Sequence, residues 1–246
     1  MNTLGLVGKN ISYSFSNSYF KQKFEDLKIT DTTYQNFDIQ DISEFPNIFK
    51  DHPNVKGLNV TIPYKEQVIP YLHKLNSRAK KIGAVNTIKI TKKGKLVGYN
   101  TDYYGFKKSL EPHLLSYHDK ALILGTGGAS KAIAYALKKL KIKFQYVSRS
   151  PKNDNTISYE SLNNDIIDAH KIIINCSPVG TFPNIHECPD IPYNAIGREH
   201  ILFDLIYNPE ETRFLKHGRE RKATTINGLN MLILQAEKAW DIWNLY

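Results

Sequence analysis

The chain has 246 residues, 41% of them hydrophobic and 23% charged, an ordinary globular composition with length for one large domain or two small ones. It contains no run of about 18 apolar residues and no basic segment followed by a long apolar one, so the sequence predicts neither a membrane span nor a signal peptide. The two cysteines, Cys176 and Cys188, are too few for a disulfide framework and lack metal-ligand spacing. We therefore expect a cytoplasmic protein that holds no metal.

The net charge of +9 raises the question of an anionic partner. The lysines are spread along the chain, with clusters at 138–143 and 213–222, and no recognisable nucleic-acid-binding motif accompanies them. We interpret them as solvated helix faces and expect neither a nucleic acid nor a membrane as partner. A positively charged cleft would attract small anionic molecules.

Strand patterns and helix patterns alternate along the chain, which is typical of an α/β protein with mainly parallel sheets. Two of the strands flank Lys93-Gly94 and are predicted to form a hairpin, because glycine tolerates the left-handed turn conformation. In chain order we predict strands at 3–7, 33–38, 55–60, 87–91, 95–99, 120–124, 144–148, 171–176 and 201–205, and helices at 16–27, 42–49, 64–71, 101–110, 129–140 and 229–243.

A glycine-rich turn, Gly125-Thr-Gly-Gly-Ala129, separates the predicted strand 120–124 from the helix that follows. Gly125 allows the tight turn, and Gly127 removes a side chain where backbone must approach a pyrophosphate. The N-terminus of the helix then offers free N–H groups to phosphate. This arrangement predicts that a dinucleotide-binding half begins with the strand. The alternative is a tight turn without a ligand.

The end of the next strand, at 144–148, indicates which dinucleotide would bind. An NAD site usually has Asp or Glu there, which accepts a hydrogen bond from the ribose 2′-hydroxyl. The segment 148–152 contains no carboxylate and includes Arg149, whose guanidinium can pair with a 2′-phosphate. We therefore expect NADP rather than NAD, with an ordinary surface arginine as the alternative.

Eight short motifs follow one another along the chain and together resemble the shikimate dehydrogenase family over essentially its whole length. Each motif alone is weak evidence, but the order and spacing of all eight make the resemblance specific. The chain departs from the family's usual form where Ser148-Arg-Ser150 replaces Asn-Arg-Thr and, within one of the eight motifs, where Cys176-Ser-Pro178 replaces Ala-Thr-Pro. The motifs are Ser14-Phe-Ser16, Asn59-Val-Thr-Ile-Pro-Tyr-Lys65, Gly83-Ala-Val-Asn-Thr87, Gly98-Tyr-Asn-Thr-Asp102, Gly125-Thr-Gly-Gly-Ala129, Asn175-Cys-Ser-Pro-Val-Gly180, Asp204-Leu-Ile-Tyr-Asn-Pro209 and Gly228-Leu-Asn-Met-Leu232 with Gln235.

The resemblance implies two domains: an N-terminal α/β substrate-binding domain at 1–102 and a Rossmann-type NADP-binding domain at 103–227. The C-terminal helix, within 228–246, is expected to pack back on the substrate domain, although its apolar stripe alone would let it dock on either half. The active site is expected in the cleft between the domains. The implied activity is the reversible NADPH-dependent reduction of 3-dehydroshikimate to shikimate, carried out by a monomer or a homodimer.

The resemblance also implies roles for single residues. Lys65 and Asp102 match the catalytic residues, and Ser14 and Ser16 match the hydroxyls that hold the substrate carboxylate. Tyr207 matches a tyrosine near that carboxylate. The groups that bind the ring hydroxyls correspond to Thr61, Asn86, Asp102 and Gln235, and the cofactor contacts correspond to Gly125, Thr126, Gly127, Gly128, Ala129, Ser148, Arg149, Ser177 and Gly228.

These residue types suit carbonyl reduction, which needs a proton donor next to the carbonyl oxygen. The Lys65 ammonium carries three N–H donors, and the Asp102 carboxylate can orient it. Simpler interpretations exist for each residue. Lys65 could be an exposed lysine at a helix start, Asp102 and the two serines could cap helices, and Gln235 could face solvent.

Three other functions are weighed against this one. A sister enzyme would oxidise quinate or use NAD with the same fold. A regulator that binds the cofactor without catalysis would have lost Lys65 or Asp102, and this chain retains both. A nucleic-acid-binding module would show salt-dependent retention on DNA.

Overall fold

The computed structural model describes residues 1–11 and 14–244 and divides the chain into two compact units. The first unit contains residues 1–101 and the chain from Ala236 onward, and the second runs from Asp102 to Gln235. The predicted domain boundaries lie at 102/103 and 227/228. The structure differs at both, because it groups Asp102 and the start of the last helix with the second unit. No helix in the described ranges is long and apolar enough to cross a membrane.

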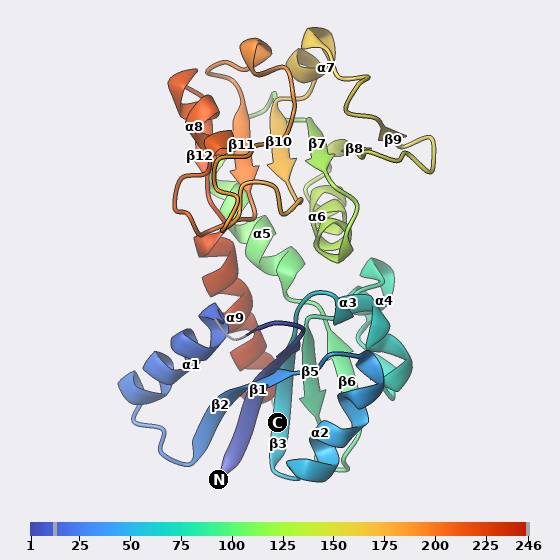
Figure 1. Cartoon of the computed structure of the whole chain (residues 1–246), viewed down its shortest axis with the longest axis vertical. Helices are drawn as coiled ribbons and strands as arrows, with labels where there is room; N and C mark the ends of the chain where they lie inside the picture. The colour runs from blue at the N-terminus through green and yellow to red at the C-terminus, as the bar shows by residue number, and fades with distance from the viewer. Residues whose placement is uncertain (12–13, 245–246) are drawn as a thin grey trace. The chain divides into compact units, whose positions relative to one another are not determined.

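A six-stranded sheet forms the centre of the first unit, in the order β2-β1-β3-β5-β6-β4 (Figure 1). The sheet is mixed, because β5 runs antiparallel to both β3 and β6. The predicted hairpin is confirmed, and Gly94 adopts a φ of +70° in its turn. The strands are β1 Asn2–Gly8, β2 Thr32–Asp38, β3 Val55–Val60, β4 Lys74–Leu75, β5 Thr87–Ile90 and β6 Leu96–Tyr99, and the α-helices are α1 Phe15–Asp26, α2 Phe45–Asp51, α3 Tyr64–Gln67 and α4 Ser77–Ile82.

Apolar side chains cover both faces of this sheet. One cluster joins the sheet to α2, α3 and α4 through residues such as Val7, Phe45 and Leu58. The other joins it to α1 and to the second half of α9 (Leu229–Asn244). The Trp243 indole donates to the Ile88 carbonyl at 3.0 Å, so the C-terminal helix packs on this sheet, as the resemblance implied.

The second unit is a doubly wound sheet in which each strand is parallel to its neighbours. Its order is β9-β8-β7-β10-β11-β12, and the order reverses between β7 and β10, where α/β proteins bind ligands. The strands are β7 Lys120–Leu124, β8 Lys143–Val147, β9 Thr156–Ile157, β10 Ile172–Asn175, β11 Ile201–Asp204 and β12 Thr224–Ile226, and the helices are α5 Asp102–Leu110, α6 Gly128–Lys139, α7 Asn164–Ala169, α8 Arg213–Glu220 and the first part of α9.

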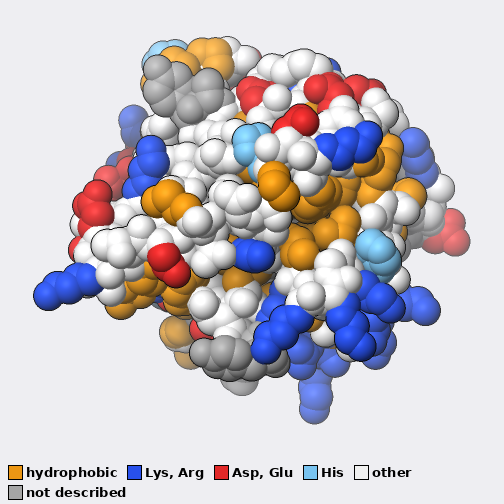
Figure 2. All heavy atoms as spheres, turned by 90° about the horizontal axis from the view of Figure 1, so that it is seen from below, with side chains coloured by type: hydrophobic (Ala, Val, Ile, Leu, Met, Phe, Trp, Pro, Cys, Tyr) orange, Lys and Arg blue, Asp and Glu red, His pale blue; other side chains and the backbone are white. Residues whose placement is uncertain are grey.

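Positive charge is less evenly spread than we expected. Residues 67–101 carry eight Lys and Arg side chains and no Asp or Glu, whereas the rest of the sequence is almost balanced. This segment runs through β4, α4 and the β5–β6 hairpin. Figure 2 shows Lys and Arg side chains gathered on one part of the face that it presents.

Candidate active site

The glycine-rich turn joins β7 to α6 in the second unit. Gly125 has a φ of +103°, and its N–H donates to the carbonyl of Val147, the last residue of β8, at 2.8 Å. A Cβ at Gly125 would lie 3.4 Å from backbone atoms of Cys176 and Ser177, so the turn closely approaches the chain that follows β10. Gly127 is the N-cap residue of the twelve-residue α6 and supplies no capping side chain. The first N–H groups of the helix are therefore available to an anion such as phosphate.

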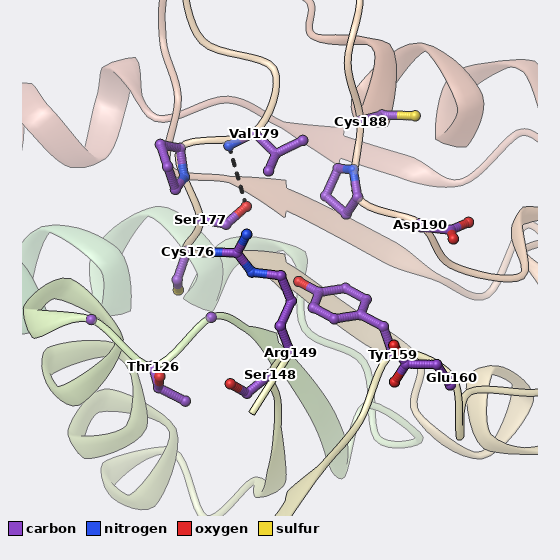
Figure 3. Close-up of a pocket in the computed structure, with 14 residues that line it drawn as sticks. Thr126, Ser148, Arg149, Tyr159, Glu160, Cys176, Ser177, Val179, Cys188 and Asp190 are labelled. Atoms are coloured by element: carbon purple, nitrogen blue, oxygen red, sulfur yellow. Dashed lines mark hydrogen bonds between the residues drawn. The ribbon is translucent and has the colours of Figure 1, made fainter. Parts of the chain in front are cut away.

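A pocket of about 640 Å³ opens beside this turn, a volume that suits a small-molecule site (Figure 3). It combines residues from the glycine-rich turn, the end of β8, the chain after β9 and the loop after β10. The lining residues are Gly125, Thr126, Gly127, Ser148, Arg149, Tyr159, Glu160, Cys176, Ser177, Pro178, Val179, Cys188, Pro189 and Asp190.

Three expected cofactor contacts lie outside this lining. Gly128 and Ala129 belong to the first turn of α6. Gly228 packs against the end of β11, where an added Cβ would lie 2.1 Å from the Leu205 carbonyl oxygen. Its N–H donates to the Ile206 carbonyl at 3.0 Å. Close packing of backbone thus requires a glycine at 228, independently of any ligand.

Arg149 lies beside Tyr159 and reaches across the pocket toward Ser177 (Figure 3). Burial raises the pKa of the Tyr159 hydroxyl, which therefore stays protonated at neutral pH. The segment 148–152 contains no carboxylate, but folding brings Glu160 and Asp190 to the same pocket. Both are exposed, so solvent screens their charge from the guanidinium. Because Glu160 and Asp190 are distant from Arg149 in the sequence, no local pattern predicts that they belong to this pocket.

Several of the expected substrate residues lie where β1 and β3 end and β5 begins, a region of the first unit that we call the polar sheet edge. Thr61 directly follows β3, and its N–H donates to the Val7 carbonyl near the end of β1 at 2.9 Å. Lys65 lies on α3 and is half-buried. The Lys65 carbonyl accepts the N–H of Val85 at 2.7 Å, which ties α3 to the chain just before Asn86 and β5.

Asn86 is held in a buried polar network. Its side-chain oxygen accepts the Thr101 N–H at 2.7 Å, and its amide donates to the Thr101 hydroxyl at 2.9 Å. Asn59 donates to the Asn86 carbonyl and to the Thr87 hydroxyl, both at 3.3 Å. These contacts fix the orientation of the Asn86 side chain. Thr87 and Thr101 were not predicted as site residues, although both belong to motifs that the sequence analysis identified.

The same network extends to α1. Ser14 caps this helix, since its hydroxyl oxygen accepts the Asn17 N–H at 3.4 Å. Ser16 is buried and forms a hydrogen bond with Tyr34, whose hydroxyl donates to the Asn59 side-chain oxygen at 2.8 Å. Burial raises the pKa of Tyr34, so this hydroxyl stays protonated. The first turn of α1 contains no acidic residue, which leaves its N-terminus favourable to an anion.

The remaining expected residues belong to the second unit. Asp102 is buried at the first position of α5. Gln235 is also buried, and its amide donates to the Leu232 carbonyl at 3.0 Å, so it does not face solvent. Tyr207 follows β11 and is 37% exposed, and partial burial raises its pKa. The pairing of Asp102 with Lys65, which belongs to the first unit, stays a prediction.

The described residues contain no group of three or more His, Cys, Asp or Glu side chains that could hold a metal ion. Cys176 and Cys188 are both free thiols. Burial raises the pKa of the Cys176 thiol well above its usual value, so it is poorly suited to act as a nucleophile.

Comparison with known proteins gives matches over the whole length of the chain. A family profile described as the shikimate dehydrogenase substrate binding domain matches residues 6–88. The shikimate dehydrogenase (NADP(+)) of Clostridium botulinum strain Hall is 39% identical, and the match covers 100% of this chain and 97% of that protein. The crystal structure of shikimate dehydrogenase 1 from Peptoclostridium difficile is 40% identical, with a TM-score of 0.85 over 99% of this chain and 91% of that one.

The fold is also similar to that of a more distant relative with bound ligands. Shikimate 5-dehydrogenase from Thermus thermophilus, solved in complex with NADP(H) and shikimate, is 26% identical with a TM-score of 0.87, over 99% of this chain and 94% of that one. The matches to the Clostridium and Peptoclostridium proteins extend through both units, including the glycine-rich pocket and the polar sheet edge. The chain therefore belongs to the shikimate dehydrogenase family.

Proposed function

We propose that the protein catalyses the reversible NADPH-dependent reduction of 3-dehydroshikimate to shikimate. The observation that carries the proposal is the end-to-end match, at 39% identity, to a shikimate dehydrogenase (NADP(+)). A pocket at the glycine-rich turn of the second unit and a polar sheet edge in the first unit support it. We expect a cytoplasmic enzyme that works as a monomer or a homodimer.

The residues of the second unit fit NADP. The Gly125–Gly127 turn and the uncapped N-terminus of α6 provide N–H groups for the pyrophosphate. Arg149 reaches into the same pocket and can hold a 2′-phosphate through two parallel N–H···O bonds. Ser148 and Ser177 add hydroxyls to the lining. NADPH, when bound, supplies the hydride for the reduction.

In the first unit, two hydroxyls and a helix N-terminus would receive the substrate carboxylate. The Ser14 oxygen already accepts a backbone N–H, which leaves its own proton available to donate. Ser16 is held by Tyr34, whose link to Asn59 continues to Asn86. We assign the binding of the ring hydroxyls to Thr61, Asn86, Asp102 and Gln235, and a contact near the carboxylate to Tyr207.

Lys65 is assigned the proton transfer. As the carbonyl becomes a hydroxyl its oxygen gains negative charge, which an ammonium within hydrogen-bond reach stabilises and then neutralises by donating a proton. Asp102 is assigned the orientation of that ammonium and one hydrogen bond to a substrate hydroxyl. α3 carries Lys65 next to the strand edge at which Thr61 and Asn86 lie, which supports a shared site.

The direct test measures NADP⁺ reduction by the purified protein through nicotinamide absorbance, with shikimate and quinate as substrates and NADP⁺ and NAD⁺ as cofactors. We expect the highest kcat/KM for shikimate with NADP⁺. Higher efficiency with quinate or with NAD⁺ would instead identify the sister enzyme. Absence of turnover with all four combinations, together with cofactor binding, would point to a regulator without catalysis.

A further inference from the structure

A buried carboxylate at the end of β11 has no cationic partner among the described residues. Asp204 has no exposed surface and accepts three hydrogen bonds, from the Thr212 hydroxyl at 2.6 Å, the Ile206 N–H at 3.0 Å and the Asn175 amide at 3.1 Å. Burial raises the pKa of Asp204 to about 6, because the loss of hydration outweighs these three donors. The fold therefore retains a charge that weakens its stability, and the reaction assigned above does not use it.

Asn175 connects this carboxylate to the chain after β10. Asn175 and Asp204 are register partners on the parallel strands β10 and β11. The Asn175 amide donates to Asp204 and to the Val179 carbonyl, at 3.1 and 3.2 Å. Its oxygen accepts the N–H and the hydroxyl of Ser177, at 3.0 and 2.6 Å. The side-chain nitrogen and the side-chain oxygen of Asn175 thus both form hydrogen bonds, and only one orientation of the amide satisfies all of them.

The segment that Asn175 holds lines the pocket. Ser177 and Val179 are lining residues, and the Ser177 hydroxyl oxygen accepts the Val179 N–H at 3.3 Å (Figure 3). The Ser177 backbone is also one of the groups that a Cβ at Gly125 would approach to 3.4 Å. The position of this segment therefore sets the width of the pocket on the side facing the glycine-rich turn.

An ionised carboxylate differs from a neutral side chain in one respect that matters here: it only accepts hydrogen bonds. Facing Asp204, Asn175 must present its N–H₂ group to β11 and its oxygen to Ser177. A flipped amide would place two oxygens together at Asp204 and two donors together at Ser177. The acceptor oxygen of Asp204, together with the Val179 carbonyl and the Ser177 N–H, thus determines the orientation of Asn175, and Asn175 in turn holds Ser177.

We propose that Asn175 and Asp204 are positioning residues for the cofactor, which hold the Ser177–Val179 segment at the distance from Gly125 that NADP binding requires. The inference rests on the proposed function, because it takes this pocket as the NADP site. It connects two sequence motifs, at 175–180 and 204–209, whose first residues have no role in the mechanism assigned above.

The test uses Asn175→Asp, which places two carboxylates face to face. One of two such groups gains a proton more readily than usual, so the pair can be restored as the pH falls. Among the described residues, Cys176 and Tyr193 interact electrostatically with Asp204, and burial raises the pKa of both so that they stay neutral between pH 6 and pH 8. Between pH 6 and pH 8, a pH dependence of NADP⁺ binding that Asn175→Asp shows and the wild type does not is therefore due to the paired carboxylates at positions 175 and 204.

The measurement is the Kd of NADP⁺ by titration calorimetry at pH 8 and pH 6, expressed relative to wild type at the same pH because the 2′-phosphate itself titrates near pH 6. For Asn175→Asp we expect binding weakened at least about tenfold at pH 8, as for an unsatisfied buried group, with most of the loss recovered at pH 6. The Kd of shikimate should stay unchanged. Asp204→Ala removes the acceptor of the Asn175 amide and should weaken NADP⁺ binding by about threefold or more at both pH values. Asp204→Asn, which can keep an acceptor oxygen toward Asn175, should lose less than Asp204→Ala.

Ser177→Ala removes the hydroxyl hydrogen bond to Asn175, keeps the backbone one and leaves the buried pair unaltered, so it serves as a second test if Asn175→Asp fails to fold. Its control is Ser148→Ala, which removes a lining hydroxyl that Asn175 does not hold. Ser177→Ala should weaken NADP⁺ binding by about threefold or more, equally at both pH values, and by more than Ser148→Ala does. Unchanged NADP⁺ binding in folded Asn175→Asp, Asp204→Ala or Ser177→Ala, a loss in Ser177→Ala no greater than in Ser148→Ala, or an equal loss of shikimate binding would overturn the inference. Wild-type protein that does not bind NADP⁺ would overturn the proposed function and this inference with it.

Discussion

Replacement of Arg149 by alanine tests the selection of NADP most directly. Arg149 reaches into the pocket from the end of β8, toward the turn that contains Ser177. Alanine removes the guanidinium and leaves the glycine-rich turn intact. We expect the KM for NADP⁺ to rise strongly and the KM for NAD⁺, which has no 2′-phosphate, to stay within about twofold.

The size of the effect follows from the exposure of the side chain. A hydrogen bond to a charged group contributes about 1.5–3 kcal/mol, and 1.36 kcal/mol corresponds to a tenfold change, which gives a range of about 10–150-fold. Arg149 is exposed, so solvent and salt screen its charge. We therefore expect a loss of about 10–30-fold in kcat/KM for NADP⁺, and a smaller NADP⁺ preference of the wild type at high salt.

Two variants serve as controls for Arg149→Ala. Arg149→Lys keeps the charge and loses the planar pair of donors, so its loss should be intermediate. Lys152 is an exposed cation three residues further along that does not line the pocket, and Lys152→Ala should stay within about twofold of wild type. The assay is kcat/KM for both cofactors at one fixed shikimate concentration. A wild type that prefers NAD⁺, an equal loss of both cofactors, or an equal effect of Lys152→Ala would refute the phosphate-binding role of Arg149.

Four further predictions concern the other residues of the site and the buried carboxylate. Lys65→Ala should still bind shikimate but lose about 10²–10⁴-fold in kcat, as for a missing general acid, and retention of more than about half of wild-type kcat would rule out the proton-transfer role. Asp102→Asn removes the charge that orients Lys65 and should lower kcat/KM for shikimate; an unchanged value would leave Asp102 only a structural role at the start of α5. Ser14→Ala combined with Ser16→Ala should weaken the binding of shikimate by about 1.5–3 kcal/mol per lost hydrogen bond and spare an analogue without the carboxylate, so equal binding losses for acid and analogue would contradict this role. Asp204→Asn should stabilise the protein above about pH 6, where the wild type buries a charged carboxylate. Burial raises the carboxyl pKa from 3.8 to about 6. Protonation of Asp204 therefore stabilises the wild-type fold by up to about 3 kcal/mol below about pH 4, and this contribution is lost as the pH rises through 6. Thermal unfolding should therefore show a larger gain in Tm at pH 8 than at pH 4.5, and an equal gain at both would contradict the assignment.

The sequence by itself predicted the main strands and the long helices, because these depend on local patterns. Each predicted strand is present, with ends that differ from the prediction by at most one residue. Gly125 and Gly94 both have the positive φ that their turns require. The predicted helices at 42–49 and 64–71 each contain a 3-10 segment beside a short α-helix, since prolines interrupt them.

Elements stabilised mainly by their neighbours were missed. β4 and β9 have two residues each, too few to show any periodicity, and they exist because β6 and β8 offer free edges. α7 has only six residues. The antiparallel direction of β5 against β3 likewise depends on how the chain returns through α4.

Only the tertiary structure decided which polar groups share a site. The motifs named Ser16 and Asn86 separately, and the fold connects them through Tyr34 on β2 and Asn59 on β3, the strands on either side of β1. It also added Glu160 to the pocket of Arg149.

The connection between Asn175 and Asp204 shows the same limit most clearly. The local sequence does not show that Asp204 is buried, because burial depends on which strands pack around it. Two of its three donors, Ile206 and Thr212, lie close to it in the chain, and the third, Asn175, lies 29 residues away on the neighbouring strand. Hydrophobic periodicity and glycine geometry are properties of a few adjacent residues, so the sequence determined them. Desolvation and the pairing of donors with acceptors depend on which strands become neighbours, and only the folded chain decides that.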